Sequence, residues 1–290
     1  MRSKEYRLKG HESFILRDGW LTKGLRAVSQ DSKVFSKFSG ADALGVGTNM
    51  AKAIRYWLRA AGLVNDTPKG VTLTGLGETL FEHDPYFEDT FSLWLVHSNI
   101  ARNSAQATSW NIFFNDITVS TFSRKELVSM MAEKIQATYD IQPPERSVAD
   151  DCSAILQMYS GDMDGHEDRD PEEKKRSPFI ALGLLKQIEN GMFEKTRPAI
   201  NELDPLIILY LIAERLGTEG IMPIDAVAGD DDMPGKILNL SRVSINDYLD
   251  ALQSAGYITV NRTAGLDVIY PDNLIPANDV VSKHYEGSMD

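Results

Sequence analysis

The sequence has 290 residues, of which 25% are charged and 42% hydrophobic, a composition typical of globular proteins. This composition and a single cysteine, Cys152, exclude a disordered chain, a collagen-like repeat and a disulfide scaffold. At about 100 to 200 residues per domain, we expect two or three domains. The longest apolar run, Leu206–Ala213, is too short to span a membrane, and Met1–Gly10 has no secretory apolar region. We therefore expect a cytoplasmic protein with no membrane partner.

The net charge of −12 is unevenly distributed along the chain. Residues 1–70 hold 13 Lys and Arg against 6 Asp and Glu, whereas residues 71–290 hold 17 against 36. A basic segment attached to an acidic protein indicates a module that binds a polyanion. A basic surface that is only solvated is the alternative.

The first predicted elements are a helix-turn-helix and a hairpin. An apolar stripe of Trp20, Leu21, Leu25 and Val28 predicts a helix over 19–28. After it we predict a short helix over 42–44, a turn at Gly45–Gly47, a helix over 49–61 capped by Thr48, and strands at 63–64 and 71–74 around a turn at 65–70. This order of elements is typical of a winged helix.

The rest of the chain is predicted to be mainly helical. The helices expected next are 86–102, opened by Pro85, then 110–117, 125–137 and 148–159. Residues 161–176 are almost wholly polar and predict an acidic linker. Helices over 205–216, 224–227 and 243–255 and a strand pair, 257–260 with 268–270, complete the chain.

These elements predict a mostly α protein with small β wings. We expect a basic winged-helix DNA-binding domain over 1–84 and a helical middle domain over 85–200 that includes the acidic linker. The third domain, over 201–290, is predicted to be an acidic, winged-helix-like module. Residues 201–275 hold 4 Lys and Arg against 12 Asp and Glu, which would repel phosphate. We therefore interpret the third domain as a surface for a protein partner or for a homodimer.

A basic face on the second helix of the first module suits the DNA major groove, which admits one α-helix. Ala51, Ile54 and Leu58 recur at helical spacing toward a core, so the basic residues lie on another face. The candidate DNA-binding residues are Arg17, Lys23, Thr48, Asn49, Lys52, Arg55, Arg59 and Lys69. A winged helix that contacts only proteins is the alternative.

The candidates for catalysis are two groups of acids. Asp162, Asp164 and Glu167, followed by Asp168 and Asp170 and beside His166, could hold a hard divalent cation, although the same residues suit a solvated linker. Glu12 and Asp18, beside His11 and Arg17, lie in the basic module, although charges at a helix entry are ordinary. Cys152 and His97 are each expected in the core.

Several segments resemble one known family. They are Gly10–Phe14, Arg17–Leu21, Leu44–Met50, Ile54–Trp57, Asp84–Tyr86, Trp94–His97, Trp110–Asn115, Asp151–Tyr159, Ser177–Leu184 and Thr263–Leu266. Together they extend over residues 8–272 and resemble the SspB-like family of bacterial Ssp DNA phosphorothioation systems, in which sulfur replaces a nonbridging phosphate oxygen on one DNA strand.

The resemblance implies a DNA-nicking protein that acts in defence against phage. Its implied partners, besides duplex DNA, are a cysteine desulfurase, an ATPase and a sulfur-transfer protein of the same system. No nuclease motif of the family can be matched residue by residue, so the catalytic residues stay unassigned. Mg²⁺ or Mn²⁺ is the expected cofactor if the protein is a nuclease, and no other cofactor is predicted. A noncatalytic winged-helix adaptor that recruits the sulfur-transfer partners is the alternative.

Overall fold

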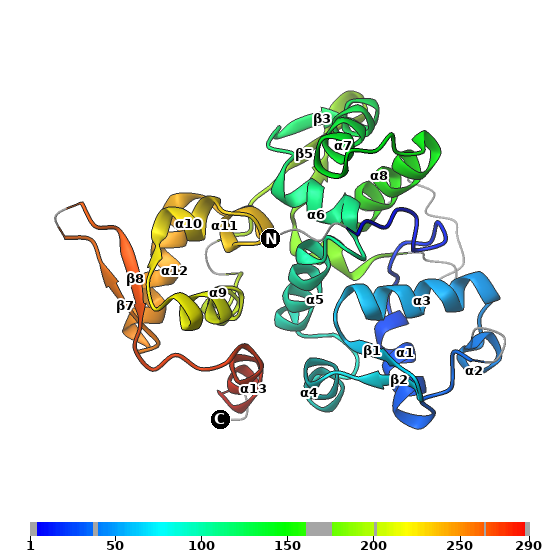
Figure 1. The fold of residues 1–290 in the computed structure, drawn as a ribbon, viewed down its shortest axis with the longest axis horizontal. Coiled ribbons are helices and arrows are strands. Elements are labelled where there is room, and N and C mark those ends of the chain that lie inside the picture. Colours follow the sequence, from blue (N-terminus) through cyan, green and yellow to red (C-terminus); the bar gives the residue numbers. More distant parts are fainter. Residues whose placement is uncertain (1–4, 37–39, 161–175, 200–201, 264, 288–290) are drawn as a thin grey trace. The chain divides into compact units, whose positions relative to one another are not determined.

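The computed structural model describes residues 5–36, 40–160, 176–199, 202–263 and 265–287. The chain forms two compact units, Met1–Thr196 and Arg197–Asp290, which we call the N-terminal and C-terminal units (Figure 1). Helices predominate in both units, and the strands form small antiparallel sheets. The mostly α class with small β elements is therefore confirmed, whereas the division into three domains stays a prediction.

The N-terminal unit begins with helices that surround a hairpin. Its first elements are α1 (Trp20–Gln30), α2 (Ala41–Leu44), α3 (Thr48–Ala60), β1 (Val64–Thr67), β2 (Gly70–Leu73) and α4 (Gly75–His83). Helix α1 buries the predicted stripe of Trp20, Leu21, Leu25 and Val28 and packs against α3, β2 and α4 (Figure 1). The helix-turn-helix and the antiparallel hairpin are therefore present in the predicted order.

Two local predictions in this region are wrong, and one helix was not predicted. Thr48 does not cap α3, because it is the first helical residue and the extended Gly47 precedes it. The hairpin turn is shorter than 65–70, since Asn65 and Asp66 pair with β2 and only Pro68 and Lys69 connect the strands. Helix α4 was not expected, because it contains two glycines, which are poor helix formers. A Cβ at Gly77 would lie 2.1 Å from the Leu63 carbonyl oxygen, so only glycine fits there.

The centre of the N-terminal unit is a helical core. It contains the four predicted helices, α5 (Thr90–Arg102), α6 (Thr108–Asn115), α7 (Arg124–Tyr139) and α8 (Glu145–Ser160), with ends that differ from the predicted ones by at most four residues, most at the start of α5. Pro85 does not open that helix: Asp89 caps it, and the Asp84 carboxylate accepts hydrogen bonds from the preceding loop and from Ser92. Cys152 and His97 are fully buried in this core, as expected.

A three-stranded sheet in this unit was not predicted. Its strands, β3 (Thr121–Ser123), β4 (Leu185–Gln187) and β5 (Met192–Lys195), lie in the order β3-β5-β4, and the 3-10 helices Pro178–Leu182 and Glu189–Gly191 flank β4. The Lys195 ammonium donates to the carbonyls of Phe113 and Ile117 and so closes the end of α6. Burial lowers the pKa of Lys195 to about 7.

The C-terminal unit is built around the apolar helix α9. In chain order it contains α9 (Pro205–Glu219), β6 (Met222–Pro223), α10 (Ile224–Gly229), α11 (Pro234–Ile237), α12 (Arg242–Ser254), β7 (Ile258–Asn261), β8 (Val268–Pro271) and α13 (Ala277–Gly287). Helix α9 packs against α12 and α13, and the strands lie in the order β6-β8-β7. The predicted helices and strand pair are confirmed; β6, α11 and α13 were not predicted.

Candidate nucleic-acid interface

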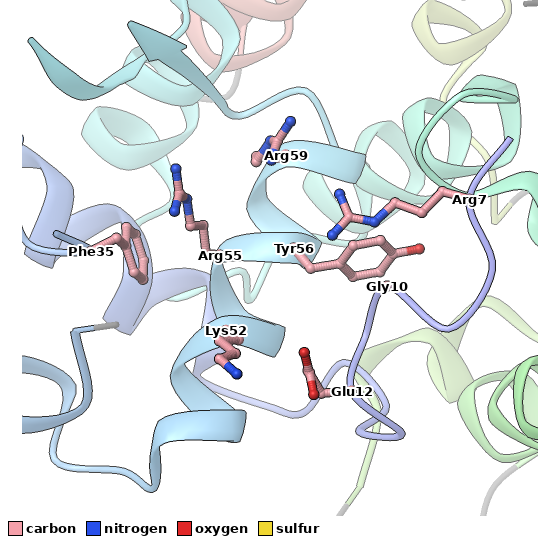
Figure 2. A pocket seen from close by; sticks show the side chains of 8 residues that line it. All are labelled: Arg7, Gly10, Glu12, Phe35, Lys52, Arg55, Tyr56 and Arg59. Atoms are coloured by element: carbon pink, nitrogen blue, oxygen red, sulfur yellow. The ribbon is translucent and has the colours of Figure 1, made fainter. Parts of the chain in front are cut away.

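A basic pocket lies between α3 and the segment that precedes α1 (Figure 2). Its volume is about 160 Å³, and it is lined by Arg7, Gly10, Glu12, Phe35, Lys52, Arg55, Tyr56 and Arg59. Four of these eight residues are Arg or Lys, and one is acidic. The pocket is therefore suited to an anion.

Helix α3 presents the predicted basic residues to this pocket. Its Ala51, Ile54 and Leu58 are buried, and the steps of three and four residues between Lys52, Arg55 and Arg59 place those side chains together on another face. Figure 2 shows the three side chains along α3, with Arg7 and Glu12 on the neighbouring N-terminal segment. The expectation that these three cations share a face is confirmed.

An acid on the hairpin holds two of the three cations. Arg55 Nη2 donates to Asp66 Oδ1 at 2.7 Å, and Arg59 Nη1 lies 3.1 Å from Asp66 Oδ2. The three side chains are between 32% and 38% exposed, so water screens these ion pairs only in part. A carboxylate held by two guanidinium groups occupies the kind of position that a phosphate takes between arginines.

Arg7 supplies a fourth cation, from a position far away in the sequence. Its backbone N–H donates to Thr108 Oγ1 at 2.8 Å, and its Nη1 donates to Gln106 Oε1 at 2.9 Å. The guanidinium carbon lies 5.3 Å from the centre of the Tyr56 ring. These contacts order a long side chain before any ligand arrives.

The wall of the pocket opposite α3 is a strained turn. Lys9, Glu12 and Ser13 have positive φ angles between 52° and 65°, a conformation that costs a non-glycine residue about 1–3 kcal/mol. Gly10 is required in this turn, because a Cβ there would lie 2.3 Å from Tyr56 Cε2. The surrounding structure must therefore hold the turn in place.

A buried carboxylate, Asp151 of α8, provides that anchor. Its Oδ1 accepts hydrogen bonds from Lys9 N and His11 Nε2, each at 2.9 Å, and its Oδ2 accepts from Ser109 Oγ at 2.6 Å. The His11 ring stacks on the Trp57 ring with 5.8 Å between centroids. One acid thus joins the turn to α3, α6 and α8.

The other predicted DNA-binding residues lie outside the pocket lining. Thr48 and Asn49 are exposed at the start of α3, Lys23 is exposed on α1, and Lys69 is exposed at the hairpin turn. All four stay predictions as DNA contacts.

Arg17 differs from these because it is half-buried before α1 rather than exposed on it. Its guanidinium carbon lies 5.4 Å from the Phe14 ring and 5.1 Å from the Trp20 ring. Burial lowers the pKa of its guanidinium. These contacts give Arg17 a packing role, and its predicted contact with phosphate stays a prediction.

The candidate catalytic residues have different surroundings. His11 is fully buried against Asp151, whereas Glu12 is exposed at the pocket, and the two side chains therefore serve different purposes. Partial burial raises the pKa of the Asp18 carboxyl, and Arg176 opposes this shift. The acids Asp162, Asp164, Glu167, Asp168 and Asp170 and the neighbouring His166 lie outside the described residues. A catalytic role for any of them stays a prediction.

Comparison with known proteins gives this fold a family. Residues 8–285 match the family described as "Protein of unknown function (DUF4007)". The chain belongs to this family. It is also similar to two solved structures, magnesium ion-bound SspB and SspB, with TM-scores of 0.84 and 0.83. Each is 25% identical, and each alignment covers 96% of this chain and 88% of the other. No curated protein matches the sequence.

Magnesium in one of those SspB structures raises the question of a metal site in this member of the DUF4007 family. Within the ranges that the structure describes, no three His, Cys, Asp or Glu side chains are grouped so that they could hold a metal ion. The described donor set therefore does not fit such a site, and we derive no reaction step through a metal. Nor does any helix of the described part of this chain reach the length and apolarity that crossing a membrane requires.

Several residues of the interface were not predicted from the sequence. Arg7, Tyr56, Asp66 and Asp151 act through contacts between segments that are far apart, and no local spacing indicates such contacts. One signal was present: Asp151 lies three residues after Val148 and four before Ile155, on the apolar stripe of its helix. An acid in such a position requires buried hydrogen-bond donors.

Proposed function

We propose that this protein binds duplex DNA through α3 and the hairpin β1-β2, arranged as a winged helix, and acts in DNA phosphorothioate modification as part of phage defence. The observation that carries the DNA-binding role is the set of four cations gathered at one pocket, in a chain whose net charge is −12. The similarity to SspB structures supports the biological setting. Contacts with a cysteine desulfurase, an ATPase and a sulfur-transfer protein belong to the same proposal.

The C-terminal unit is proposed as the surface for protein partners or a second copy. All four basic residues of positions 201–275 already form ion pairs: Arg215 with Glu219 and Asp230, Lys236 with Asp231, Arg242 with Asp225 and Asp267, and Arg262 with Asp250. The remaining charge of this segment is acidic, which disfavours DNA. We therefore place the DNA-binding role in the N-terminal unit alone.

Replacing Asp66 by asparagine tests the DNA-binding proposal by a gain of affinity. Phosphate has to compete with this carboxylate for Arg55 and Arg59, and each half-exposed ion pair is worth about 0.2–1 kcal/mol. The variant should therefore bind a fluorescent duplex several-fold more tightly than the wild-type protein. The measurement is fluorescence anisotropy at several salt concentrations, because phosphate contacts give a linear fall of log affinity with log salt.

The matched control is Glu133→Gln, which removes an exposed acid from α7. It changes the net charge by the same amount and should leave the affinity nearly unchanged. If Asp66→Asn and the control have equal affinities, DNA lies elsewhere. A weaker affinity for Asp66→Asn would mean that Asp66 orients the arginines for DNA instead of competing with it.

Nicking of DNA is the enzymatic part of the proposal. Incubation with supercoiled plasmid, with and without Mg²⁺ or Mn²⁺, should produce relaxed circles. Two variants then locate the reaction: Glu12→Gln at the pocket, and the triple neutralisation of Asp162, Asp164 and Glu167. Protein that binds DNA but yields no relaxed circles would leave the noncatalytic adaptor as the function.

A further inference from the structure

The basic pocket is recessed, and this shape limits what it can hold. Its volume of about 160 Å³ is smaller than the roughly 300–1,000 Å³ of pockets that bind drug-sized ligands. Gly10 of the strained turn and Phe35 line it together with residues of α3, so several elements of the chain bound the pocket (Figure 2). One phosphate group with some hydration fits this volume, whereas a base pair does not.

The charge around the pocket matches a doubly charged group. Arg7, Lys52, Arg55 and Arg59 carry four positive charges, while Glu12 on the lining and Asp66 behind it carry two negative ones. The excess of two positive charges equals the charge that a phosphate monoester approaches at pH 7, about −1.5 to −2. A phosphodiester inside a DNA strand carries only one negative charge.

The donors are also arranged for such a group. Among the residues that the structure describes, the Arg7 side chain donates one hydrogen bond, from Nη1 to Gln106 Oε1, and the same side chain lines the pocket. Lys52 forms no ion pair with any residue that the structure describes, and it is exposed. Arg7 comes from the N-terminal segment and Lys52 from α3, so two different elements of the chain supply donors to this pocket.

We propose that this pocket receives the terminal phosphate monoester of a DNA strand. The inference rests on the proposed DNA-binding function and adds a preference for strand ends over continuous duplex. Arg7 would provide a forked pair of donors, Lys52 a point charge, and Glu12 would weaken the binding of any anion. The pocket would thus hold one end of a broken strand beside α3.

The test compares two duplexes of one sequence, one with 5′-phosphate and one with 5′-hydroxyl ends. The wild-type protein should prefer the phosphorylated duplex by about tenfold, the effect of one charge-assisted hydrogen bond on a binding constant. Arg7→Gln should bring this ratio close to one, Arg7→Lys should keep part of it, and Glu12→Gln should raise it. Lys125→Gln, a distant exposed cation on α7, is the control that should keep the wild-type ratio.

Two further measurements separate the possible failures. Closed circular DNA has no strand ends, so salt-dependent binding to it tests the DNA-binding function alone. Competition by inorganic phosphate and by a 5′-mononucleotide tests whether the monoester suffices without a strand. Equal affinities for the two duplexes, or a ratio that Arg7→Gln leaves intact, would overturn the pocket proposal while the DNA-binding function stands. Unchanged tryptophan fluorescence in each variant would show that the fold is preserved.

Discussion

Replacing Asp151 by alanine is expected to lower the free energy of unfolding of the N-terminal unit by about 3 kcal/mol or more, because hydrogen bonds to a charged group are worth about 1.5–3 kcal/mol each. Its side chain is 1% exposed, and it accepts hydrogen bonds from Lys9, His11 and Ser109. Alanine leaves these three donors without an acceptor, and two of them, on His11 and Ser109, belong to fully buried residues. Because a whole domain is stabilised by only about 5–15 kcal/mol, one substitution would remove a large part of the total.

The effect on function follows from the position of this carboxylate. The turn that Asp151 holds contains Lys9, Glu12 and Ser13, all with positive φ. Without the hydrogen bonds to Asp151, nothing offsets the free-energy cost of the positive φ angles, so the turn should relax. Gly10 and Glu12 would then move out of the pocket wall. A variant that still folds should therefore lose the preference for phosphorylated ends before it loses DNA binding.

Urea unfolding followed by tryptophan fluorescence measures the first effect. All four tryptophans, Trp20, Trp57, Trp94 and Trp110, lie in the N-terminal unit, so the signal reports on that unit alone. Asp150→Ala is a closely matched control: it removes the neighbouring acid, which is 30% exposed and pairs with Lys9, and should cost less than about 1 kcal/mol. Equal urea midpoints of unfolding for Asp151→Ala and Asp150→Ala would contradict the anchoring role of Asp151. If Asp151→Ala does not fold, Asp151→Asn, which keeps one acceptor oxygen, should show a smaller loss.

Local patterns predicted the helices well because their apolar periodicity is long and regular. The helix around Trp20, for example, follows a stripe that only a buried face explains, whereas the helix around Leu209 follows a continuous apolar run. The sheet β3-β5-β4 escaped prediction because its strands are three or four residues long and Thr121 pairs with Glu194, more than seventy residues away. Helix α4 was not predicted because Gly77, which lets the helix approach Leu63, also lowers the helix propensity of this segment.

The candidate interface likewise contains residues that local sequence patterns predict and residues that come together only through contacts between distant segments. Lys52, Arg55 and Arg59 were predictable, since spacing along one helix decides which side chains share a face. Arg7 and Asp66, which come from other segments, were not, although they change the chemistry most. Arg7 adds a second side to the basic face of α3, and the two sides form the pocket. Asp66 already forms ion pairs with Arg55 and Arg59. The uneven charge along the chain indicated a polyanionic ligand. The recessed shape of the pocket and the competition of Asp66 with phosphate follow only from tertiary packing.

Replacing Lys52, Arg55 and Arg59 together by alanine should weaken duplex binding by about 10²-fold at 0.15 M salt. Each of the three cations that neutralises one phosphate contributes roughly 0.9 to the slope of log affinity against log salt, so the slope should change by up to about 2.7. Helix α3 should persist, because alanine has the highest helix propensity and the three side chains lie outside the core. Asp66 loses its partners, but at 33% exposed it can be hydrated.

The matched control for this triple variant replaces Lys125, Lys134 and Arg146, three exposed cations of α7 and α8, by alanine. It removes the same charge from the same unit, so any general attraction to DNA falls equally in both variants. A difference in salt slope between the two then counts only contacts made at α3. Equal slopes would mean that DNA is attracted by the unit as a whole, and that the pocket of Arg7, Lys52, Arg55 and Arg59 is not where the strand lies.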